Sequence, residues 1–175
     1  NRSGNIFNGA RRSHRTKNPL NVIIQSHLRN GTLVDLFSGV GTFATLLAPT
    51  ANRVFAVESD PRAVRAAVDN ATGCDNVALL ESDAAEGLAH IGGTPDAVIA
   101  DPPRSGLGPG LTALLGRLAP PRIVYVSCEP STLARDAKRL VADGYVLTSS
   151  RVIDMFPQTF HVELCALLRR LVAAY

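Results

Sequence analysis

Short, almost continuously apolar segments alternate with helix-like segments along most of the chain. Apolar runs of this kind are typical of parallel strands in a sheet that is covered on both faces. The predicted strands are 33–37, 53–58, 77–81, 96–100, 122–127, 145–156 and 161–170. The predicted helices are 21–29, 43–48, 60–71, 84–90, 110–118 and 130–142.

The order of these segments predicts the architecture. Five strand-then-helix units are followed by two strands with no helix between them. We therefore expect an α/β domain with a doubly wound, seven-stranded mixed sheet whose last strand is antiparallel. In such sheets a ligand sits at the carboxyl ends of the parallel strands. The loops that directly follow the strands are therefore the places to look for functional residues.

Charge divides the chain into two parts. The 175 residues carry a net charge of +3, from 18 Lys+Arg and 15 Asp+Glu. Residues 1–20 hold five of these bases and no acid, whereas residues 21–175 hold 13 bases and 15 acids. We interpret 1–20 as a basic arm or linker and 21–175 as the folded domain. An all-basic arm is typical of a segment that contacts RNA phosphates, and equally of a solvated tail.

Composition limits the classes of protein to consider. Hydrophobic residues make up 46% of the chain, which is enough for a sizeable core. No apolar run reaches the roughly eighteen residues of a membrane-spanning helix, so we expect no membrane partner. The three cysteines are widely spaced and form no CxxC pair, so we expect no metal site in this chain. A core this apolar needs no disulfides, and a reducing, cytoplasmic location is expected.

The loop after the first strand has the features of a nucleoside-binding turn. Gly39 and Gly41 allow a tight turn and a close approach of the backbone to a ligand. Glu58, at the end of the second strand, is placed to accept hydrogen bonds from a ribose diol. The glycines also fit a loose dinucleotide pattern. Asp35 and Phe37 favour S-adenosylmethionine instead, because its sulfonium cation suits a nearby carboxylate.

Two further loops carry polar residues at strand ends. Asp83 follows the third strand, where its carboxylate suits an adenine amino group or the N-cap of helix 84–90. Asp101 follows the fourth strand and precedes Pro102 and Pro103. Two prolines fix an extended backbone, which makes either a rigid lip against a flat ring or a stiff crossover loop.

The ends of the last strands supply a nucleophile and a carboxylate. Cys128 lies between the fifth strand and a helix that opens near Pro130, where the helix dipole favours a thiolate. We interpret Cys128 as a candidate nucleophile, and Cys74 and Cys165 as inert core residues. Glu163 begins the last strand, beside the fifth, and is either a general base or a solvated edge carboxylate.

Four segments taken together resemble a known family. DLFSGVGTF, DPPRSGL, SCEPSTLARD and DMFPQTFHVE, in this order, look like the catalytic domain of the RNA 5-methyluridine methyltransferases, over roughly residues 16–170. The resemblance implies the Rossmann-like, class I S-adenosylmethionine-dependent fold for residues 21–175. It implies S-adenosylmethionine as cofactor, rRNA or tRNA as partner, Cys128 as nucleophile and Glu163 as general base. The implied cofactor-binding residues are Phe37, Gly39, Gly41, Glu58, Asp83 and Asp101, and Asp101 also faces the uracil.

The implied chemistry explains the residue types. Carbon-5 of uracil is a poor nucleophile, but it gains enolate character when a Cys128 thiolate adds to carbon-6. Carbon-5 then accepts the methyl group, and a base, Glu163 by resemblance, removes its proton. The target base has to be flipped out of any stack. Similar cytosine-C5 enzymes carry a second catalytic cysteine after the fourth strand, whereas this loop reads DPPRSG, so the sequence favours uridine.

Three positions depart from the family pattern. Thr16 stands where a cofactor-contacting glutamine is expected, Thr42 where many members have Asn, and Glu129 where Asn or Asp is usual. These changes leave Cys128 and Glu163 intact and bear on cofactor affinity.

The chain also lacks the upstream RNA-binding domain of full-length family members, and its first residue is not Met. We therefore expect an excised or truncated catalytic domain. Two alternatives to a uridine methyltransferase stay open. One is an inactive module that binds S-adenosylmethionine or RNA. The other is a nucleobase amino-group methyltransferase that uses the DPP segment and needs no cysteine.

Overall fold

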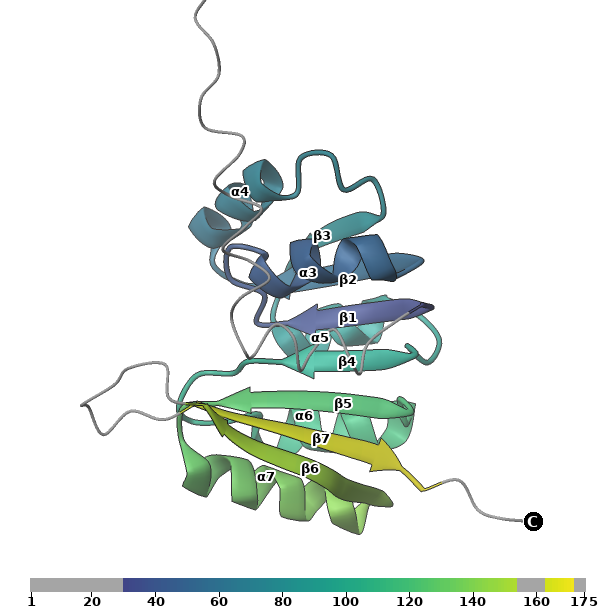
Figure 1. The fold of residues 1–175 in the computed structure, drawn as a ribbon, viewed down its shortest axis with the longest axis vertical. Coiled ribbons are helices and arrows are strands. Elements are labelled where there is room, and N and C mark those ends of the chain that lie inside the picture. Colours follow the sequence, from purple (N-terminus) through teal and green to yellow (C-terminus); the bar gives the residue numbers. More distant parts are fainter. Residues whose placement is uncertain (1–29, 154–162, 172–175) are drawn as a thin grey trace, which may run out of the picture.

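A computed structural model describes residues 30–153 and 163–171 (Figure 1). The strands are β1 (Thr32–Leu36), β2 (Arg53–Glu58), β3 (Val77–Glu81), β4 (Ala97–Ala100), β5 (Arg122–Ser127), β6 (Tyr145–Ile153) and β7 (Glu163–Arg170). The helices are α3 (Thr42–Leu47), α4 (Pro61–Asn70), α5 (Ala84–His90), α6 (Gly108–Leu118) and α7 (Pro130–Ala142), with a 3₁₀ turn at Ala48–Thr50.

All seven strands form one sheet, in the order β3-β2-β1-β4-β5-β7-β6. Neighbouring strands from β3 to β5 are parallel, whereas β7 is antiparallel to both β5 and β6. The predicted seven-stranded mixed sheet with an antiparallel last strand is therefore confirmed. The strand order reverses between β1 and β4, which is where ligands bind in open α/β sheets.

The hydrophobic pattern located most elements to within a residue or two. Strands 53–58, 77–81 and 122–127 and helices 84–90 and 130–142 have the predicted bounds. β6 is described up to Ile153 and β7 from Glu163, so the predicted bounds at 156 and 161 lie outside the described residues. The predicted helix 21–29, the basic arm 1–20 and the segment between β6 and β7 lie outside the described residues.

Proline and aspartate at helix starts explain why several boundaries were predictable. Asp60 caps α4 by accepting a hydrogen bond from the Arg62 N–H, and Pro61 occupies the first turn. Asp83 caps α5 in the same way. These signals are local, because a cap satisfies backbone donors of its own helix, so the sequence alone reveals them.

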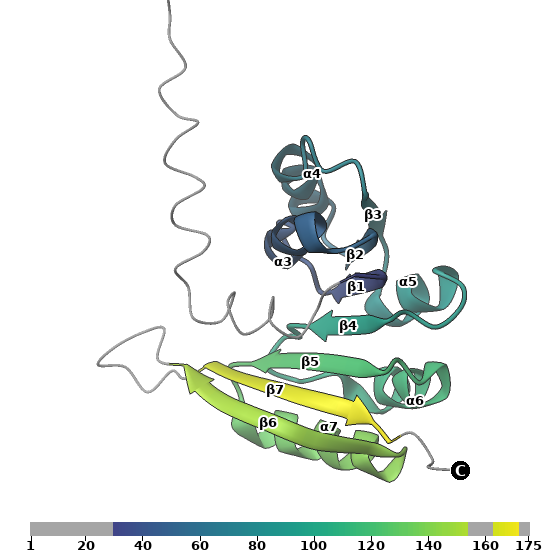
Figure 2. The ribbon, with the colours of Figure 1, turned by 45° about the vertical axis from the view of Figure 1, so that its right-hand side comes forward.

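Helices lie on both faces of the sheet (Figures 1 and 2), and each face carries its own hydrophobic core. The side chains of α5, α6 and α7 pack on one face, around a cluster that includes Leu88, Leu115 and Leu140. On the other face α3 contributes Phe43 and the residues up to Leu47, with α4 beside it. Burial on both faces accounts for the continuous apolar runs of β1, β4 and β5.

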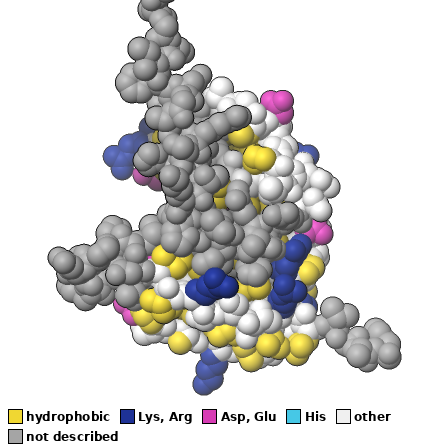
Figure 3. Space-filling view, viewed as in Figure 1, with side chains coloured by type: hydrophobic (Ala, Val, Ile, Leu, Met, Phe, Trp, Pro, Cys, Tyr) yellow, Lys and Arg dark blue, Asp and Glu magenta, His cyan; other side chains and the backbone are white. Residues whose placement is uncertain are grey.

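Strand β6 is the outer strand on the side of the sheet away from β3. Among its residues, Val146, Leu147 and Val152 are exposed. Figure 3 shows hydrophobic side chains on the surface over this lower part of the molecule. Most of the predicted functional residues lie instead at the ends of the inner strands, from β2 to β7, whereas Asp83 follows the other edge strand, β3.

Two helical glycines test how closely α5 packs on the sheet. A Cβ on Gly87 would lie 2.5 Å from Cγ1 of Val57, whereas a Cβ on Gly110 of α6 would meet no atom within 4 Å. We expect Gly87→Ala to lower the free energy of unfolding by about 1–3 kcal/mol through overpacking. Gly110→Ala is the matched control and should raise it by up to about 1 kcal/mol through helix propensity. Urea unfolding of both variants measures the difference, and equal effects would contradict the close packing.

Candidate active site

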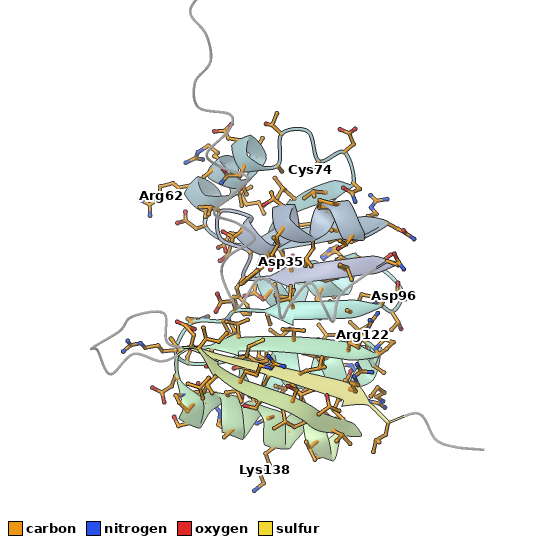
Figure 4. All side chains as sticks on the ribbon, viewed as in Figure 1. Asp35, Arg62, Cys74, Asp96, Arg122 and Lys138 are labelled. Atoms are coloured by element: carbon orange, nitrogen blue, oxygen red, sulfur yellow. The ribbon has the colours of Figure 1, made fainter. Side chains whose placement is uncertain are left out.

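Several predicted residues lie along the carboxyl edge of the parallel strands, which is the left edge of the sheet in Figure 1. Leu36 of β1 pairs with Val57 of β2 and with Ala100 of β4. The residues that follow these three positions are Phe37, Glu58 and Asp101. Figure 4 labels Asp96 and Arg122 at the opposite edge, where β4 and β5 begin. The structure therefore brings the starts of the loops after β1, β2 and β4 side by side at the same edge of the sheet.

The carboxylates at this edge share a face of the sheet. Asp35 lies two residues after Leu33, and Glu163 lies two residues before Cys165, and both of these apolar residues belong to the core under α3. Since strand side chains alternate between faces, Asp35 and Glu163 point to the α3 face. Glu58 follows the same rule from Ala56.

The loop from Phe37 to Gly41 is an unusually tight turn. Phe37, Gly39 and Gly41 have φ angles of 60°, 53° and 76°, in the left-handed region. The Gly41 N–H donates to the Ser38 carbonyl at 2.8 Å. A Cβ on Gly41 would lie 3.3 Å from that of Ala67 on α4, so glycine fits both the conformation and the space. The left-handed backbone turns the Phe37 side chain to the face of the sheet opposite the carboxylates, where it packs on the core.

Glu58 is held by backbone donors on both sides of its carboxylate. Its Oε2 accepts a hydrogen bond from the Gly39 N–H at 2.9 Å. Its Oε1 accepts from the N–H groups of Ser59 and Asp60, both at 2.8 Å. The side chain is half-buried, so a remaining lone pair stays accessible to a ligand. Glu58 therefore ties the glycine loop to β2 and fixes the orientation of its own carboxylate.

Asp35 is a fully buried carboxyl group with one unsatisfied oxygen. Its Oδ2 accepts a hydrogen bond from the Ala44 N–H at 2.9 Å, whereas Oδ1 has no partner among the described residues. Figure 4 labels it on β1, between the layers. Burial, and then the charges of Asp101 and Glu58, raise the pKa of Asp35 to about 8. Ser38 Oγ, in the adjoining loop, is a second buried polar atom without a described partner.

A cavity of about 360 Å³ opens beside the glycine loop. Its lining includes Phe37, Asp83, Ala84 and the segment from Ser105 into the first turn of α6. Asp83 Oδ1 accepts a hydrogen bond from the Ala85 N–H at 2.9 Å, so the predicted N-cap is confirmed. Its other carboxylate oxygen and the exposed position of the residue are compatible with the predicted adenine contact, which stays a prediction.

The charge of Glu163 acts on Asp101, although Asp101 follows β4 and Glu163 begins β7. Partial removal from water, and then the negative charge of Glu163, raise the pKa of Asp101 to about 6. The residue keeps an exposed surface, and its N–H donates to the Leu36 carbonyl at 3.4 Å. The effect of the Glu163 charge on Asp101 shows that the residue after β4 lies near the first residue of β7.

Cys128 and Glu163 come together through the register of β5 and β7. The last pair of this antiparallel ladder is Ser127 with Leu164. Cys128 directly follows Ser127 and Glu163 directly precedes Leu164, so both residues lie at the same end of the ladder. Cys128 is half-buried, and its neighbours are fixed because the Glu129 N–H donates to Ser127 Oγ at 3.0 Å.

The residues that depart from the family pattern have structural roles where they are described. Glu129 is the N-cap of α7, and its Oε1 accepts from Ser131 Oγ at 2.8 Å. Hydrogen bonds from Ser131, and then the nearby charge of Arg104, hold the pKa of Glu129 below its usual range. Thr42 is the exposed first residue of α3. Thr16 lies outside the described residues.

The other two cysteines lie away from this edge. Cys165 is buried within β7 and pairs with Val126, and burial raises the pKa of its thiol to about 11. Cys74 is half-buried after α4, near β3, as Figure 4 shows. Cys165 is therefore a core residue as predicted, whereas the prediction of a core position for Cys74 holds only in part.

Sequence reasoning missed Asp136 of α7. The residue is fully buried and accepts hydrogen bonds from β5, from the loop after β4 and from two arginines of its own helix. A signal was available, because Asp136 lies three residues after Leu133 and four before Leu140, on the apolar face of the helix. A carboxylate on such a face requires a buried partner.

The described residues contain no group of three or more His, Cys, Asp or Glu side chains arranged to hold a metal ion. None of the helices in the same part of the chain has the length and the hydrophobicity that a membrane-spanning helix requires.

Sequence comparison finds relatives that match this chain over most of its length. A family model described as tRNA (Uracil-5-)-methyltransferase matches residues 94–171. An uncharacterised RNA methyltransferase of Thermotoga maritima is 46% identical over 136 residues, which are 77% of this chain and 31% of the relative. A 23S rRNA (uracil(1939)-C(5))-methyltransferase of Shewanella sediminis is 42% identical, over 79% of this chain and 32% of its own length. The chain thus spans about a third of the length of these relatives.

Solved structures share the fold. The Pyrococcus abyssi tRNA (uracil-54, C5)-methyltransferase, in complex with S-adenosyl-L-homocysteine, matches with a TM-score of 0.73 and 36% identity, over 85% of this chain and 37% of its own. Precorrin-6y C5,15-methyltransferase of Geobacter metallireducens matches with a TM-score of 0.71 at 20% identity, over 86% of each chain. The second likeness concerns the fold alone.

The raised pKa of Asp35 predicts how stability depends on pH. Because the folded state holds a proton on Asp35 up to about pH 8 and the unfolded chain releases it near pH 3.8, the free energy of unfolding falls as pH rises between these values. Between pH 6 and 8 the loss should approach about 1.4 kcal/mol per pH unit. We expect Asp35→Asn to abolish this slope, because the amide carries no charge and still accepts from Ala44.

Urea unfolding at pH 6, 7 and 8 measures the slope. The matched control is Asp60→Asn, an exposed cap whose pKa is lowered, which should keep the slope of the unmodified chain. An unchanged slope in Asp35→Asn would show that Asp35 is ionised in the folded protein.

Proposed function

We propose that this chain, which belongs to the RNA uracil-5-methyltransferase family through its catalytic region, transfers a methyl group from S-adenosylmethionine to carbon-5 of a uridine in RNA. The predicted fold class is confirmed, since the seven-stranded sheet has the class I S-adenosylmethionine-dependent methyltransferase fold. The proposal adds to this family the roles of individual residues and the order of the chemical steps.

The residues at the carboxyl edge fit S-adenosylmethionine. When bound, this cofactor supplies a methyl group activated by a sulfonium cation, and it also carries an ammonium group. The edge holds Asp35, Glu58 and Asp101, and burial, and then the charges of Asp101 and Glu58, raise the pKa of Asp35. Cations relieve the repulsion between such charges. The unpartnered Oδ1 of Asp35 and Oγ of Ser38 are polar atoms of the kind that a bound ligand or water satisfies.

Three residues are assigned to the nucleoside part of the cofactor. The fixed carboxylate of Glu58 accepts the ribose hydroxyls, because Gly39, Ser59 and Asp60 already orient it. Phe37 and Asp83 line the cavity of about 360 Å³, where an aromatic ring and a carboxylate suit the face and the amino group of adenine. The left-handed turns at Gly39 and Gly41 let the backbone pass close to the ligand.

The position of Cys128 and Glu163 at the same end of the β5–β7 ladder carries the proposal. A nucleophile and a base that act on neighbouring carbons of one ring must approach it from adjacent positions. Antiparallel pairing supplies that spacing, because opposite side chains lie on the same face of a sheet. Asp101 faces Glu163 from the loop after β4 and borders the same space, where Pro102 and Pro103 stiffen the lip.

The steps follow from this placement. The Cys128 thiolate forms a bond to carbon-6 of the uracil, and the electron pair of the 5,6 double bond moves onto the ring enolate. Carbon-5 then forms a bond to the methyl group, the bond from the methyl group to the sulfonium sulfur breaks with release of S-adenosylhomocysteine, and carbon-5 carries the methyl group together with its original hydrogen. Glu163 takes that hydrogen as a proton, the 5,6 double bond forms again, and the bond from Cys128 to carbon-6 breaks. The thiolate is thereby regenerated for the next turnover.

Covalent trapping tests the role of Cys128. RNA that contains 5-fluorouridine has no proton at carbon-5, so the adduct should persist after methylation. We expect the unmodified chain and Cys74→Ala to form an adduct that survives denaturing gels, and Cys128→Ala to form none. Cys128→Ala should lose methyl transfer by about a thousandfold or more and keep its affinity for S-adenosylhomocysteine. Methyl transfer without Cys128 would instead support an amino-group methyltransferase.

Substitution of Glu163 separates two steps, the addition of Cys128 to carbon-6 and the release of the methylated base from Cys128. We expect Glu163→Gln to accumulate the covalent adduct on ordinary uridine RNA, because Cys128 still adds but no base removes the proton from carbon-5. The matched control is Glu81→Gln, an exposed carboxylate at the end of β3, which should turn over normally. Normal turnover by Glu163→Gln would make Glu163 a strand-edge carboxylate without a role as base.

The RNA class is identified with the same reagent. Cellular RNA labelled with 5-fluorouridine is incubated with the chain, and the RNA that remains attached is sequenced. Relatives named for tRNA and for 23S rRNA predict recovery of one of these two classes. A chain that binds S-adenosylhomocysteine but traps no RNA would be a cofactor-binding module.

A further inference from the structure

Asp136 is a buried charge with four donors around it. No part of the residue is exposed, although α7 lies at the surface of the fold. Oδ1 accepts hydrogen bonds from Arg139 Nη1 at 2.7 Å and from Arg135 Nε at 3.1 Å. Oδ2 accepts from the Leu107 N–H at 2.7 Å and from Tyr125 Oη at 3.1 Å. Burial acts to raise its pKa, but the hydrogen bonds from Arg135, Leu107 and Tyr125 outweigh burial and hold the pKa low.

Asp136 binds the loop after β4. Leu107 ends this loop and is the N-cap residue of α6, and its apolar side chain cannot cap the helix. A Cβ on Gly106, whose φ is 79°, would overlap Oδ2 of Asp136, so the loop backbone lies directly on the carboxylate. Arg135 Nη2 reaches the Ser105 carbonyl at 2.7 Å. The consecutive loop residues Ser105, Gly106 and Leu107 therefore all lie against the Arg135–Asp136 pair.

Asp136 also binds strand β5, which ends one residue before Cys128. Tyr125 lies three residues before Cys128 in β5, is fully buried, and donates to the same Oδ2 that binds the loop. The helix that carries Asp136 begins at Pro130, directly after Cys128 and its neighbour. One carboxylate oxygen therefore connects the loop after β4 with the strand and the helix on either side of Cys128.

The connected loop borders the proposed cofactor site. Ser105, Gly106 and Leu107 line the cavity of about 360 Å³, opposite Phe37 and Asp83. The same loop begins at Asp101, which faces Glu163. A movement of residues 105–107 away from α7 would therefore change the cavity and the distance from its wall to Cys128 together.

A buried ion pair is a poor source of stability, because removing charges from water costs about as much as their attraction returns. Arg135 and Arg139 also stay partly in solvent, with side chains 45% and 37% exposed, which weakens the attraction further. The geometric constraint is the stronger consequence, since the donors come from three separate elements and fix their relative positions.

We infer that Asp136 is a positioning residue, which holds residues 105–107 against α7 and so fixes the wall of the cofactor cavity relative to Cys128. This inference rests on the proposed function for what the cavity binds. It does not depend on that function for the connection itself. Asp136 touches neither the cavity nor Cys128 and acts through Leu107, Tyr125 and Arg135.

The test compares two variants in which a buried tyrosine loses its hydroxyl group. Tyr125→Phe removes the hydroxyl that donates to Asp136. Tyr145→Phe is the matched control, because it removes an equally buried hydroxyl that donates to the Pro120 carbonyl at 2.9 Å, at the other end of the sheet. Asp136→Asn keeps the size of the side chain and removes its charge. The three variants are compared by amide hydrogen exchange over residues 103–111 and by calorimetry with S-adenosylhomocysteine.

We expect Asp136→Asn to speed exchange over residues 103–111 by about tenfold or more and to weaken S-adenosylhomocysteine binding to a similar degree. Tyr125→Phe should change both in the same direction by about threefold, and Tyr145→Phe should change neither, although both tyrosine variants lose a buried hydrogen bond. If Tyr125→Phe behaves like Tyr145→Phe and Asp136→Asn lowers only the melting temperature, Asp136 stabilises the fold without positioning the loop.

The two proposals fail in different ways. If the unmodified chain does not bind S-adenosylhomocysteine, the proposed cofactor is wrong, and faster exchange over residues 103–111 in Asp136→Asn still supports the positioning role. If Asp136→Asn does not fold, Tyr125→Phe against Tyr145→Phe decides the matter on its own. Equal exchange in these two variants would overturn the inference even when cofactor binding is normal.

Discussion

The antiparallel insertion of β7 between β5 and β6 is the constraint on which the site depends. A parallel strand reaches the carboxyl edge of the sheet with its last residue, whereas β7 reaches it with its first. Only this reversal brings Glu163 to the edge where Cys128 lies. A shift of the β5–β7 register by one residue would turn Glu163 to the other face of the sheet, so the buried residues that fix the register, among them Cys165 and Leu167, also fix the face on which Glu163 lies.

The acidic residues at the carboxyl edge of the sheet gather there for one reason. Parallel strands end at the same level, so acidic residues at strand ends accumulate there whatever their distance in the sequence. Burial raises the pKa values of Asp35 and Asp101 to about 8 and about 6, and neighbouring charges add to the rise, from Asp101 and Glu58 at Asp35 and from Glu163 at Asp101. A folded chain tolerates such an assembly at a cost in stability. The arrangement suits a cationic ligand and disfavours an anionic one.

The sequence predicted most of the fold because its signals are local. Apolar runs located the strands, and Asp60 and Asp83 marked helix starts with their own caps. The strand ends located the candidate site for the same reason. Asp136 and the conformation of Phe37 were not predicted, because both depend on distant partners. Asp136 bonds to a loop 29 residues away in the chain. The left-handed backbone of Phe37, unusual for an aromatic residue, follows from the turn that the sheet imposes.

Glu58 shows what such a scaffold does for binding. Three backbone N–H groups hold its carboxylate, so the side chain has lost its rotational freedom when the protein folds. A free glutamate would surrender that freedom each time a ligand bound, at a cost of the order of 1 kcal/mol per ordered side chain. Here the entropy is lost once, during folding, and a diol that reaches the carboxylate meets an acceptor already in place. In the proposed site the glycine loop would thus set the thermodynamics of binding as well as the shape, through a residue nearly twenty positions away.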